Sequence, residues 1–438
     1  MTETESYLNR IPMWASRKNS LPHIRDFLEQ SGCREELLNI IHVAGTNGKG
    51  SVCSYMTSIL TEAGYRVGTF ISPHLVTVRE RFLINGEAVE EAVFESAFQK
   101  VKRLSETMRG RGYEAPSYFE FLFYMFMIIC QEEQPDFVIL ETGMGGLLDT
   151  TNVIRRPVLT VITSISMDHM QYLGDTVPKI AAQKAGILKP QVPVVYDGSS
   201  REGSQVIRER AGELGCPAWE ITEKDYTLAG RDEAGARILI ETGTGPLEVR
   251  ITSRADYQMI NGTLAVKSLD VLRTLGKAVI SDEAVKAGVE KSFWPARMEE
   301  ILPGVYLDGA HNIGGMEALT RTIGRMQQET GKPVTLMFGV ASDKEYHEMI
   351  RKLCSTVRIS RVTIARMDTD RSASTEELAR DFRRWLGCPV DVFDTVGQAW
   401  EHFLREKGGS LAFCAGSLYL AGEVKALCTG EGDGYDRF

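Results

Sequence analysis

The strongest chemical signal in the sequence is a glycine-rich segment, Gly45-Thr46-Asn47-Gly48-Lys49-Gly50-Ser51, between a short apolar run and a periodic apolar stretch. Glycines let backbone N–H groups approach phosphate oxygens, and a helix that begins beside them adds the positive end of its dipole. Lys49 can then reach the β and γ phosphates of a nucleotide, and Ser51 can offer a hydroxyl to Mg²⁺. The general Walker pattern fits imperfectly, because Val43 stands where its first glycine belongs and Gly50 separates lysine from serine. Even so, the segment predicts an ATP-binding loop rather than a plain tight turn.

Polar residues also follow three other apolar runs in the first half of the chain. Ser72, Glu141 and the pair Asp168-His169 each come after such a run. The carboxyl ends of strands in an open α/β sheet form the ligand crevice, so we expect these side chains at the same edge as the loop. A hydroxyl, a carboxylate and an imidazole there can ligate a divalent metal beside phosphate, although histidine is a less usual partner for Mg²⁺. Each of them alone is as readily a cap or a satisfied polar group, so this prediction depends on the loop.

Two further segments place ionisable side chains in notable surroundings. Lys184 lies among small and apolar residues, where an ammonium is costly unless it is paired; a surface lysine with a buried stem is the alternative. Asp308-Gly309-Ala310-His311-Asn312 follows an apolar run and precedes a stretch rich in small residues. The second half of the chain therefore repeats the arrangement of a ligand-facing edge.

The elements that must position these residues alternate between strand and helix. Continuous apolar runs suit parallel strands that are covered on both faces, and in the first half they occupy residues 38–43, 67–71, 137–140 and 158–165. A helix is predicted over residues 178–187. Between about 220 and 256 the pattern changes to short alternating segments broken by glycine, which indicates a small antiparallel excursion.

Strand and helix alternate again after Trp294-Pro295-Ala296-Arg297. Strands are predicted near residues 305–307, 334–338, 361–365, 390–393 and 411–414. Ser342-x-x-Glu345 and Ser374-x-x-Glu377 have the spacing of capping boxes and predict two helix starts. We therefore expect an α/β protein with a P-loop-type, mostly parallel sheet ATPase domain over residues 1–295 and a smaller Rossmann-like domain over 296–438.

Composition narrows the class of protein. The chain has 438 residues, of which 43% are hydrophobic and 25% charged, as in a globular protein of two or three domains. The net charge is −9 and no segment gathers lysines and arginines, so we expect no nucleic-acid partner. The most apolar run, residues 121–130, is about half the length of a membrane helix, and the acidic start lacks a secretory pattern. We expect no membrane association and a cytoplasmic protein.

Taken together, these segments resemble the folylpolyglutamate synthase and dihydrofolate synthase family of the wider Mur ligase group. The resemblance is carried by residues 42–51, 72–74, 79–82, 141–146, 149–152, 165–169, 184–190, Gln258-x-x-Asn261, 308–312 and Gly416-Ser417, in the order found in the family. The family's own phosphate loop departs from the Walker pattern in the same way.

The resemblance implies ATP-dependent amide formation between a carboxylate of a folate or dihydropteroate and the amino group of L-glutamate. Lys49 and the loop amides would hold the β and γ phosphates, and His311 would lie near them. Two Mg²⁺ sites would be surrounded by Ser51, Ser72, Glu141 and His169. Lys184 matches a lysine that can carry a metal-binding carbamate, and the remaining ATP contacts would come from Asn261, Arg297 and Asp308. The family is mostly monomeric, so a monomer is expected.

The sequence departs from the family pattern at two positions. Leu147 stands where arginine is usual, and Thr142 where an aliphatic residue is commoner. Loss of a guanidinium can remove a partner for an anionic substrate group, so a Mur-type ligase acting on a non-folate carboxylate stays open. A P-loop ATPase or phosphotransferase that makes no amide is the second alternative, although it has no evident need for Arg297 and Asp308 in the second half.

Overall fold

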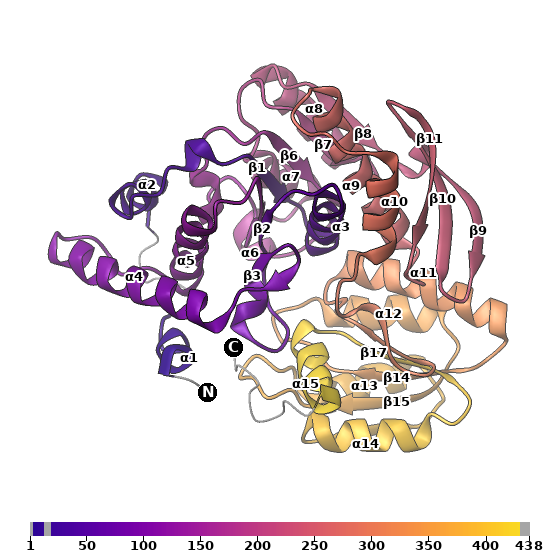
Figure 1. Ribbon diagram of the computed structural model, residues 1–438. Helices are drawn as coiled ribbons and strands as arrows, with labels where there is room; N and C mark the ends of the chain where they lie inside the picture. The colour runs from indigo at the N-terminus through magenta and orange to yellow at the C-terminus, as the bar shows by residue number, and fades with distance from the viewer. Residues whose placement is uncertain (1–2, 13–18, 430–438) are drawn as a thin grey trace.

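The computed structural model describes residues 3–12 and 19–429 and contains two large sheets and one small one. Figure 1 shows two lobes, with the C-terminal elements in orange and yellow below the rest of the chain. We call the part built on the eight-stranded sheet the first lobe and the part built on the six-stranded sheet the second lobe. The predicted fold class, α/β with mostly parallel sheets, is confirmed.

The first lobe is built around strand β1, which lies between β5 and β6 in the order β4-β3-β2-β5-β1-β6-β7-β8. The strands from β2 to β8 in this order are parallel, whereas β3 and β4 pair antiparallel at the edge. Their bounds are β1 (Ile40–Ala44), β2 (Val67–Phe70), β3 (Phe82–Ile84), β4 (Glu87–Ala88), β5 (Phe137–Glu141), β6 (Leu159–Ile162), β7 (Val194–Asp197) and β8 (Ala218–Ile221). Every residue of β1, β5, β6 and β7 is buried, which accounts for the continuous apolar runs in the sequence.

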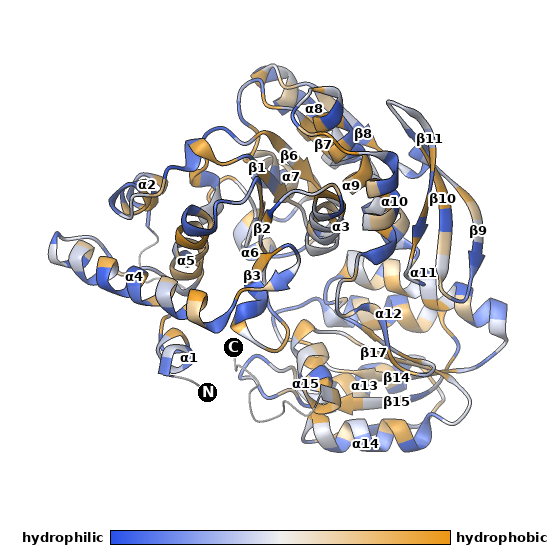
Figure 2. Ribbon diagram, in the orientation of Figure 1, coloured by the Kyte–Doolittle hydropathy of each residue, from blue (hydrophilic) through white to orange (hydrophobic). Residues whose placement is uncertain are grey.

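Helices cover both faces of this sheet. One face packs against α3 (Lys49–Glu62), α9 (Tyr257–Thr274) and α10 (Asp282–Lys291). The other packs against α2 (Leu21–Gln30), α4 (Glu91–Gly110), α5 (Tyr118–Glu133), α7 (Val177–Ala185) and α8 (Arg201–Leu214). Figure 2 shows the strands between these layers in hydrophobic colours. Within the described residues, no helix is both long and apolar enough to cross a membrane.

The small sheet is the predicted antiparallel excursion, with strands β9 (Tyr226–Asp232), β10 (Gly235–Thr242) and β11 (Gly245–Ile251). It is shorter than the predicted range of 220–256. Residues 220–221 end β8, which pairs parallel with β7 in the large sheet, residues 223–225 form a 3-10 turn, and residues 252–256 connect β11 to α9.

The second lobe has the strand order β12-β13-β17-β14-β15-β16, in which only β12 is antiparallel to its neighbour. Its strands are β12 (Arg297–Leu302), β13 (Val305–Asp308), β14 (Val334–Phe338), β15 (Ile359–Ala365), β16 (Val390–Phe393) and β17 (Leu411–Ala415). One face packs against α11 (Ile313–Thr330), α12 (Tyr346–Thr356) and α13 (Thr375–Trp385), and the other against α14 (Val396–Glu406) and α15 (Leu418–Thr429). The chain enters this sheet at Arg297, but a domain boundary at residue 295 or 296 stays a prediction.

One of the two predicted capping boxes is wrong. Ser374 caps α13 and accepts from the backbone N–H of Glu377, which confirms the predicted helix start, although the Glu377 carboxylate accepts from the hydroxyl of Tyr346. Ser342 caps nothing, because residues 342–344 form a turn and α12 begins only at Tyr346, with Glu345 as its N-cap residue. This turn has a different role, since it carries Lys344 towards the first lobe.

Candidate functional site

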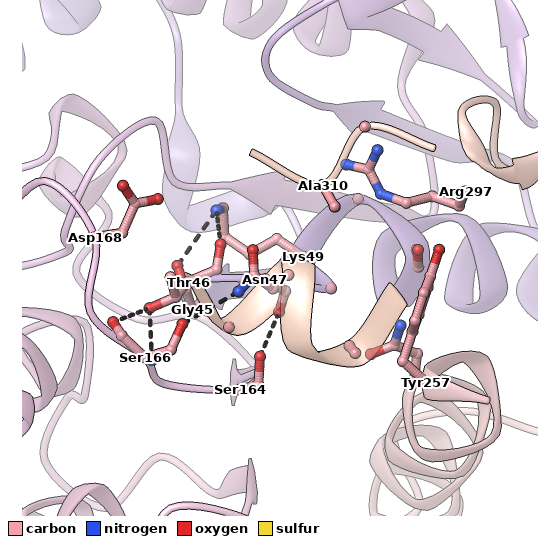
Figure 3. A pocket seen from close by; sticks show the side chains of 18 of the residues that line it. Gly45, Thr46, Asn47, Lys49, Ser164, Ser166, Asp168, Tyr257, Arg297 and Ala310 are labelled. Carbon is pink, nitrogen blue, oxygen red and sulfur yellow. Dashed lines mark hydrogen bonds between the residues drawn. The ribbon is translucent and has the colours of Figure 1, made fainter. Parts of the chain in front are cut away.

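A cavity of about 1130 Å³ lies between the two lobes. It is lined by every candidate residue identified in the sequence, namely the loop 45–51, Ser72, Glu141, His169, Lys184, Asn261, Arg297, Asp308 and His311. Figure 3 shows the loop lying between Asp168 on one side and Arg297 with Tyr257 on the other. The structure therefore brings together residues that are spread over most of the chain.

The loop needs its glycines for space as well as for conformation. Gly45 and Gly48 have φ values of 154° and 89°, which favour glycine. A Cβ atom on Gly45 would lie 1.8 Å from Oγ1 of Thr163, and one on Gly50 would lie 2.6 Å from the indole of Trp294. Gly50, which separates lysine from serine and so departs from the Walker pattern, is thus required because Trp294 packs against the first turn of α3.

Lys49 is the first residue of α3 and curls back over the loop (Figure 3). Its ammonium donates to the carbonyl oxygens of Gly45 and Thr46, at 3.3 Å each, and lies 3.8 Å from the Glu141 carboxylate. The charge is therefore held directly over the loop, beside the end of β5. An anion that entered the loop would replace weak carbonyl contacts with a strong charge-assisted one.

Glu141 and Ser51 carry buried side-chain oxygen atoms in the same cavity as Lys49. Glu141 is 3% exposed, and burial raises the pKa of its carboxyl above the usual value, while nearby Lys49 opposes the shift. One of its oxygens accepts from the backbone N–H of Ser72 at 3.0 Å, so the end of β5 is tied to the loop after β2. Ser51 is equally buried and its Oγ accepts from Nε2 of Gln258 at 3.1 Å.

This donor set suits Mg²⁺ in its chemistry. Hydroxyl and carboxylate oxygens are the protein ligands that Mg²⁺ prefers. In the part of the chain that the structure describes, no three His, Cys, Asp or Glu side chains gather as a metal cage. That agrees with the usual Mg²⁺ arrangement, in which one or two carboxylates are supplemented by substrate phosphates and water. A buried carboxylate that a single lysine at 3.8 Å only partly neutralises is also suited to a second cation.

His169 lies at the margin of this group. It adopts a left-handed backbone conformation with φ of 48°, and its side chain is 37% exposed. Burial and the neighbouring Lys344 lower the pKa of its imidazole to about 4, against the opposing pull of Asp168. At neutral pH the ring is uncharged, which leaves a nitrogen lone pair free to bind a metal or accept a proton.

Lys184 is buried, contrary to the alternative of a surface lysine. Its side chain is 3% exposed, and its ammonium donates to the carbonyl oxygen of Gly45 at 2.7 Å. Burial, with a contribution from nearby Lys49, lowers the pKa of the amine to about 7. A large share of this amine is therefore neutral, and nucleophilic, at physiological pH.

The second-lobe side of the cavity is organised around Asp308. Its carboxylate accepts hydrogen bonds from the backbone N–H groups of Met298 and Ala310 and from the hydroxyl of Tyr257. These bonds fix the strand that carries Arg297. The residues on both sides of Arg297, Ala296 and Met298, have positive φ values of 52° and 55° although neither is glycine. Such strain is retained where surrounding structure holds it and is common at functional sites.

His311 follows Asp308 into the cavity. Its Nδ1 contacts the carbonyl oxygen of Gly309 at 2.8 Å, and its Nε2 lies 3.9 Å from Asp168. Burial, followed by the positive charge of Lys344, lowers the pKa of this imidazole to about 4. The neutral ring can donate from Nδ1 and present a free lone pair on Nε2.

Sequence reasoning missed several residues of the second-lobe side. Lys344 donates to Asp168 at 2.7 Å across the cavity, and Arg371 forms a two-point ion pair with Asp343 beside it. Although burial by itself would raise the pKa of Asp168, His311 and Lys344 hold it well below its usual range. The sequence offered only the reading of a capping box around Lys344, which gave no hint of a contact with the first lobe.

Leu147, which stands where the family has arginine, belongs to the loop after β5. Its side chain is 44% exposed, and its backbone N–H donates to the carbonyl oxygen of Gln183 at 2.7 Å. The turn is therefore held by the backbone, and the Leu147 side chain is open to solvent and does not line the cavity. Thr142, by contrast, is buried directly after β5.

Comparison with known proteins places this geometry in a family. The Mur ligase, glutamate ligase domain matches residues 296–418. Dihydrofolate synthase/folylpolyglutamate synthase of Bacillus subtilis is 34% identical over 421 residues, which cover 93% of this chain and 94% of that protein. The crystal structure of folylpolyglutamate synthase from Thermotoga maritima matches with a TM-score of 0.82 and 28% identity, covering 98% of this chain and 96% of that one.

The Escherichia coli enzyme FolC in complex with DHPP and ADP matches with a TM-score of 0.83 and 26% identity, over 98% of this chain and 97% of that one. Both structural matches extend over both lobes and the cavity between them. The chain belongs to the folylpolyglutamate synthase and dihydrofolate synthase family of ATP-dependent ligases.

Proposed function

We propose that this protein uses ATP to join L-glutamate to a carboxylate of a folate or dihydropteroate, with release of ADP and phosphate. The observation that carries the proposal is that the phosphate loop of the first lobe and cationic side chains of the second line the same cavity. A simple ATPase needs only the first of these two sides. The ADP and DHPP bound to the E. coli relative support the same assignment of nucleotide and acceptor.

The chemistry needs activation because a carboxylate is a poor acyl donor. A carboxylate oxygen of the acceptor attacks the γ-phosphorus of ATP, the bond to the bridging oxygen breaks, and ADP leaves. The glutamate amine then attacks the acyl carbon, and phosphate leaves as the amine loses its proton. The protein contributes mainly by holding the reactants in line and by stabilising charge.

In this proposal the loop N–H groups and Lys49 bind the β and γ phosphates, while Asn261, Arg297 and Asp308 bind the rest of the nucleotide. Mg²⁺ would be held at two sites drawn from Ser51, Ser72, Glu141 and His169, where it would neutralise charge on the transferred phosphoryl group. The neutral imidazole of His311 is placed to accept the proton that the attacking amine loses. These assignments are supported by the shared lining of the cavity and by the charge states given above.

We further propose that Lys184 carries a carbamate. The neutral amine adds to carbon dioxide and loses a proton, which converts a buried cation into a carboxylate able to bind metal. A pKa near 7 and a position beside the loop support this, because the reactive form is the uncharged amine. Exchange with ¹³C-labelled bicarbonate, followed by carbon NMR of wild type and Lys184→Arg, tests it. A carbamate signal that persists in the arginine variant would assign it elsewhere.

The amino acid is proposed to bind on the second-lobe side. Lys344 and Arg371 are cationic groups lining this part of the cavity, and glutamate brings two carboxylates to be neutralised. In the structure described here these cations are paired with Asp168 and Asp343, respectively. An incoming carboxylate would compete for them, so binding of the amino acid is coupled to the contact between lobes.

The deciding experiment supplies purified protein with MgATP, radiolabelled glutamate and either dihydropteroate or tetrahydrofolate. We expect a labelled amide product with at least one acceptor. ATP consumption without any labelled product would favour a hydrolase, and product with a different carboxylate would favour the Mur-type alternative that Leu147 leaves open. The monomeric state and the cytoplasmic location remain predictions, to be checked by light scattering and by cell fractionation.

A further inference from the structure

Asn312 is the residue at which the phosphate loop, Asp168 and the second lobe meet. It is the N-cap of α11 and is 4% exposed. Its Oδ1 accepts from Nδ2 of Asn47 at 3.1 Å and from the backbone N–H of Gly315 at 2.8 Å. Its Nδ2 donates to Oδ1 of Asn47 at 3.0 Å and to Oδ2 of Asp168 at 2.8 Å. The side-chain amide of Asn312 therefore accepts two hydrogen bonds and donates two.

Asn47 is itself anchored in the first lobe. Its side-chain amide also donates to Oγ of Ser166 at 3.2 Å. Its backbone carbonyl oxygen accepts from the hydroxyls of Thr163 and Ser164. The loop therefore cannot follow Asn312 freely if the lobes shift. The two asparagines form a reciprocal pair of hydrogen bonds between a fixed loop and the start of a second-lobe helix.

The backbone of α11 approaches the first lobe so closely at Gly314 that no side chain fits there. A Cβ atom on Gly314 would lie 2.5 Å from Oγ of Ser166 and 3.4 Å from Nδ2 of Asn47. The first turn of α11 thus rests directly on the phosphate loop and the segment after β6. On the other side of the network, Asp168 accepts from Lys344, so one carboxylate is held by two second-lobe residues.

We propose that Asn312 is a positioning residue that docks the second lobe on the phosphate loop in a single register during ligation. The inference rests on the proposed function, because it assigns the docking to the step in which the amine meets the activated carboxylate. Capping of α11 alone does not require an asparagine, since serine and aspartate cap helices as well. The reciprocal pair does require an amide, because only an amide presents one acceptor and one donor to Asn47.

The chemical consequence follows from distance. Reacting atoms must approach to about 3 Å, and a displacement of about 1 Å can slow a positioned reaction by roughly a hundredfold. His311 immediately precedes Asn312 in the chain, and Lys344 shares Asp168 with it. A change in how Asn312 docks would therefore move the groups proposed to handle the amine while leaving Lys49 in place.

The test uses two substitutions that both keep the helix cap. Asn312→Ser retains one acceptor for Gly315 but cannot reach Asn47 and Asp168, and Asn312→Asp places an oxygen where Asp168 and Asn47 need a donor. We expect kcat for amide formation to fall roughly a hundredfold in both variants, while ADP affinity changes less than about tenfold because the loop is untouched. Ser374→Asp, a cap swap at the exposed N-cap residue of α13, is the matched control with unchanged kcat.

A second substitution that restores activity distinguishes a docking role of Asn312 from a general structural role. Combining Asn312→Asp with Asp168→Asn restores a donor opposite an acceptor, and we expect the double variant to regain at least fivefold in kcat over Asn312→Asp. Wild-type kcat in both single variants, or a double variant no better than Asn312→Asp, would overturn the proposal.

Unfolding provides a readout that does not depend on ligation. In a double-mutant cycle with Asn47→Ala and Asn312→Ala, we expect the two substitutions to be coupled by about fivefold or more in the unfolding equilibrium constant. Additive effects would contradict the contact. If the wild-type protein formed no amide while this coupling was present, the proposed function would fail and the docking contact would stand.

Discussion

The two sides of the cavity are built in different ways. On the first-lobe side, Lys49, Glu141 and Lys184 find their partners in the loop and strands of the same lobe. On the second-lobe side, Lys344 and Asn312 reach across the cavity to side-chain partners in the first lobe, Asp168 and Asn47. The side formed by the glycine-rich loop is therefore held together within one lobe, whereas the side around Lys344 and Asn312 depends on docking. Binding of ATP and transfer to glutamate should respond differently to substitutions on the two sides.

The largest expected effect comes from removing the charge over the loop. Lys49→Ala should reduce amide formation by roughly a thousandfold or more, because the cation that faces the β and γ phosphates is lost. Circular dichroism should be unchanged, since the ammonium bonds only to loop carbonyls and Glu141. Lys179→Ala, an exposed lysine of α7, serves as the control. Substantial turnover by Lys49→Ala would show that the loop does not bind phosphate as proposed.

A smaller effect is expected for Glu141→Gln, which keeps the shape of the side chain and an acceptor for Ser72 but removes the charge. Amide formation should fall about a hundredfold at moderate Mg²⁺ and recover partly at high Mg²⁺, because a ligand is weakened rather than a fold element lost. Titration of activity with Mg²⁺ measures this, with exposed Glu290→Gln as control. An unchanged Mg²⁺ requirement would remove Glu141 from the metal site.

Acid should weaken the packing around the central strand of the first lobe. His42 in β1 is fully buried beneath the loop and bonds to Thr151, and burial lowers the pKa of its imidazole to about 3. The corresponding strand β17 contains no histidine or carboxylate. Because the unfolded chain takes up the proton first, at about pH 6.5, the stabilisation is present above that pH and is lost as pH falls towards 3.

From pH 7 to pH 5 this single group should cost about 2 kcal/mol of unfolding free energy. Urea unfolding of wild type and His42→Gln at the two pH values measures the effect, since glutamine can keep a bond to Thr151 without titrating. The wild type should lose more stability than the variant. Equal losses would mean that the imidazole of His42 has the same pKa in the folded protein as in the unfolded chain.

The smallest of these effects concerns the second-lobe side. Lys344→Gln should raise the KM for glutamate about tenfold, the size of one weakened charge-assisted bond, with a smaller change in the KM for ATP. Initial rates at varied glutamate and ATP separate the two constants. Lys352→Gln, on α12 and paired with Glu317, is the control. Equal changes in both constants would contradict the division between the two sides of the cavity.

Much of the fold was predictable because its signals are local. The buried strands β5, β14 and β17 begin and end within one residue of their predicted positions, because a strand covered on both faces is a nearly continuous apolar run. Predictions at the edges were less accurate. The predicted excursion began at about residue 220 and so included the end of β8, because a short half-exposed strand looks alike in sequence whichever sheet it joins.

The sequence by itself determined the phosphate loop, the alternation of strands and helices, and the family, because each depends on residue types at fixed local spacing. Only the tertiary structure decided why Gly50 interrupts the Walker pattern, since the indole that excludes a side chain there belongs to Trp294. It also decided the contacts between the lobes. Asn47 and Asn312 are 265 residues apart and Asp168 and Lys344 are 176 apart, and no local pattern marks them as partners. These contacts form only when the two lobes, each packed around its own sheet, pack against each other.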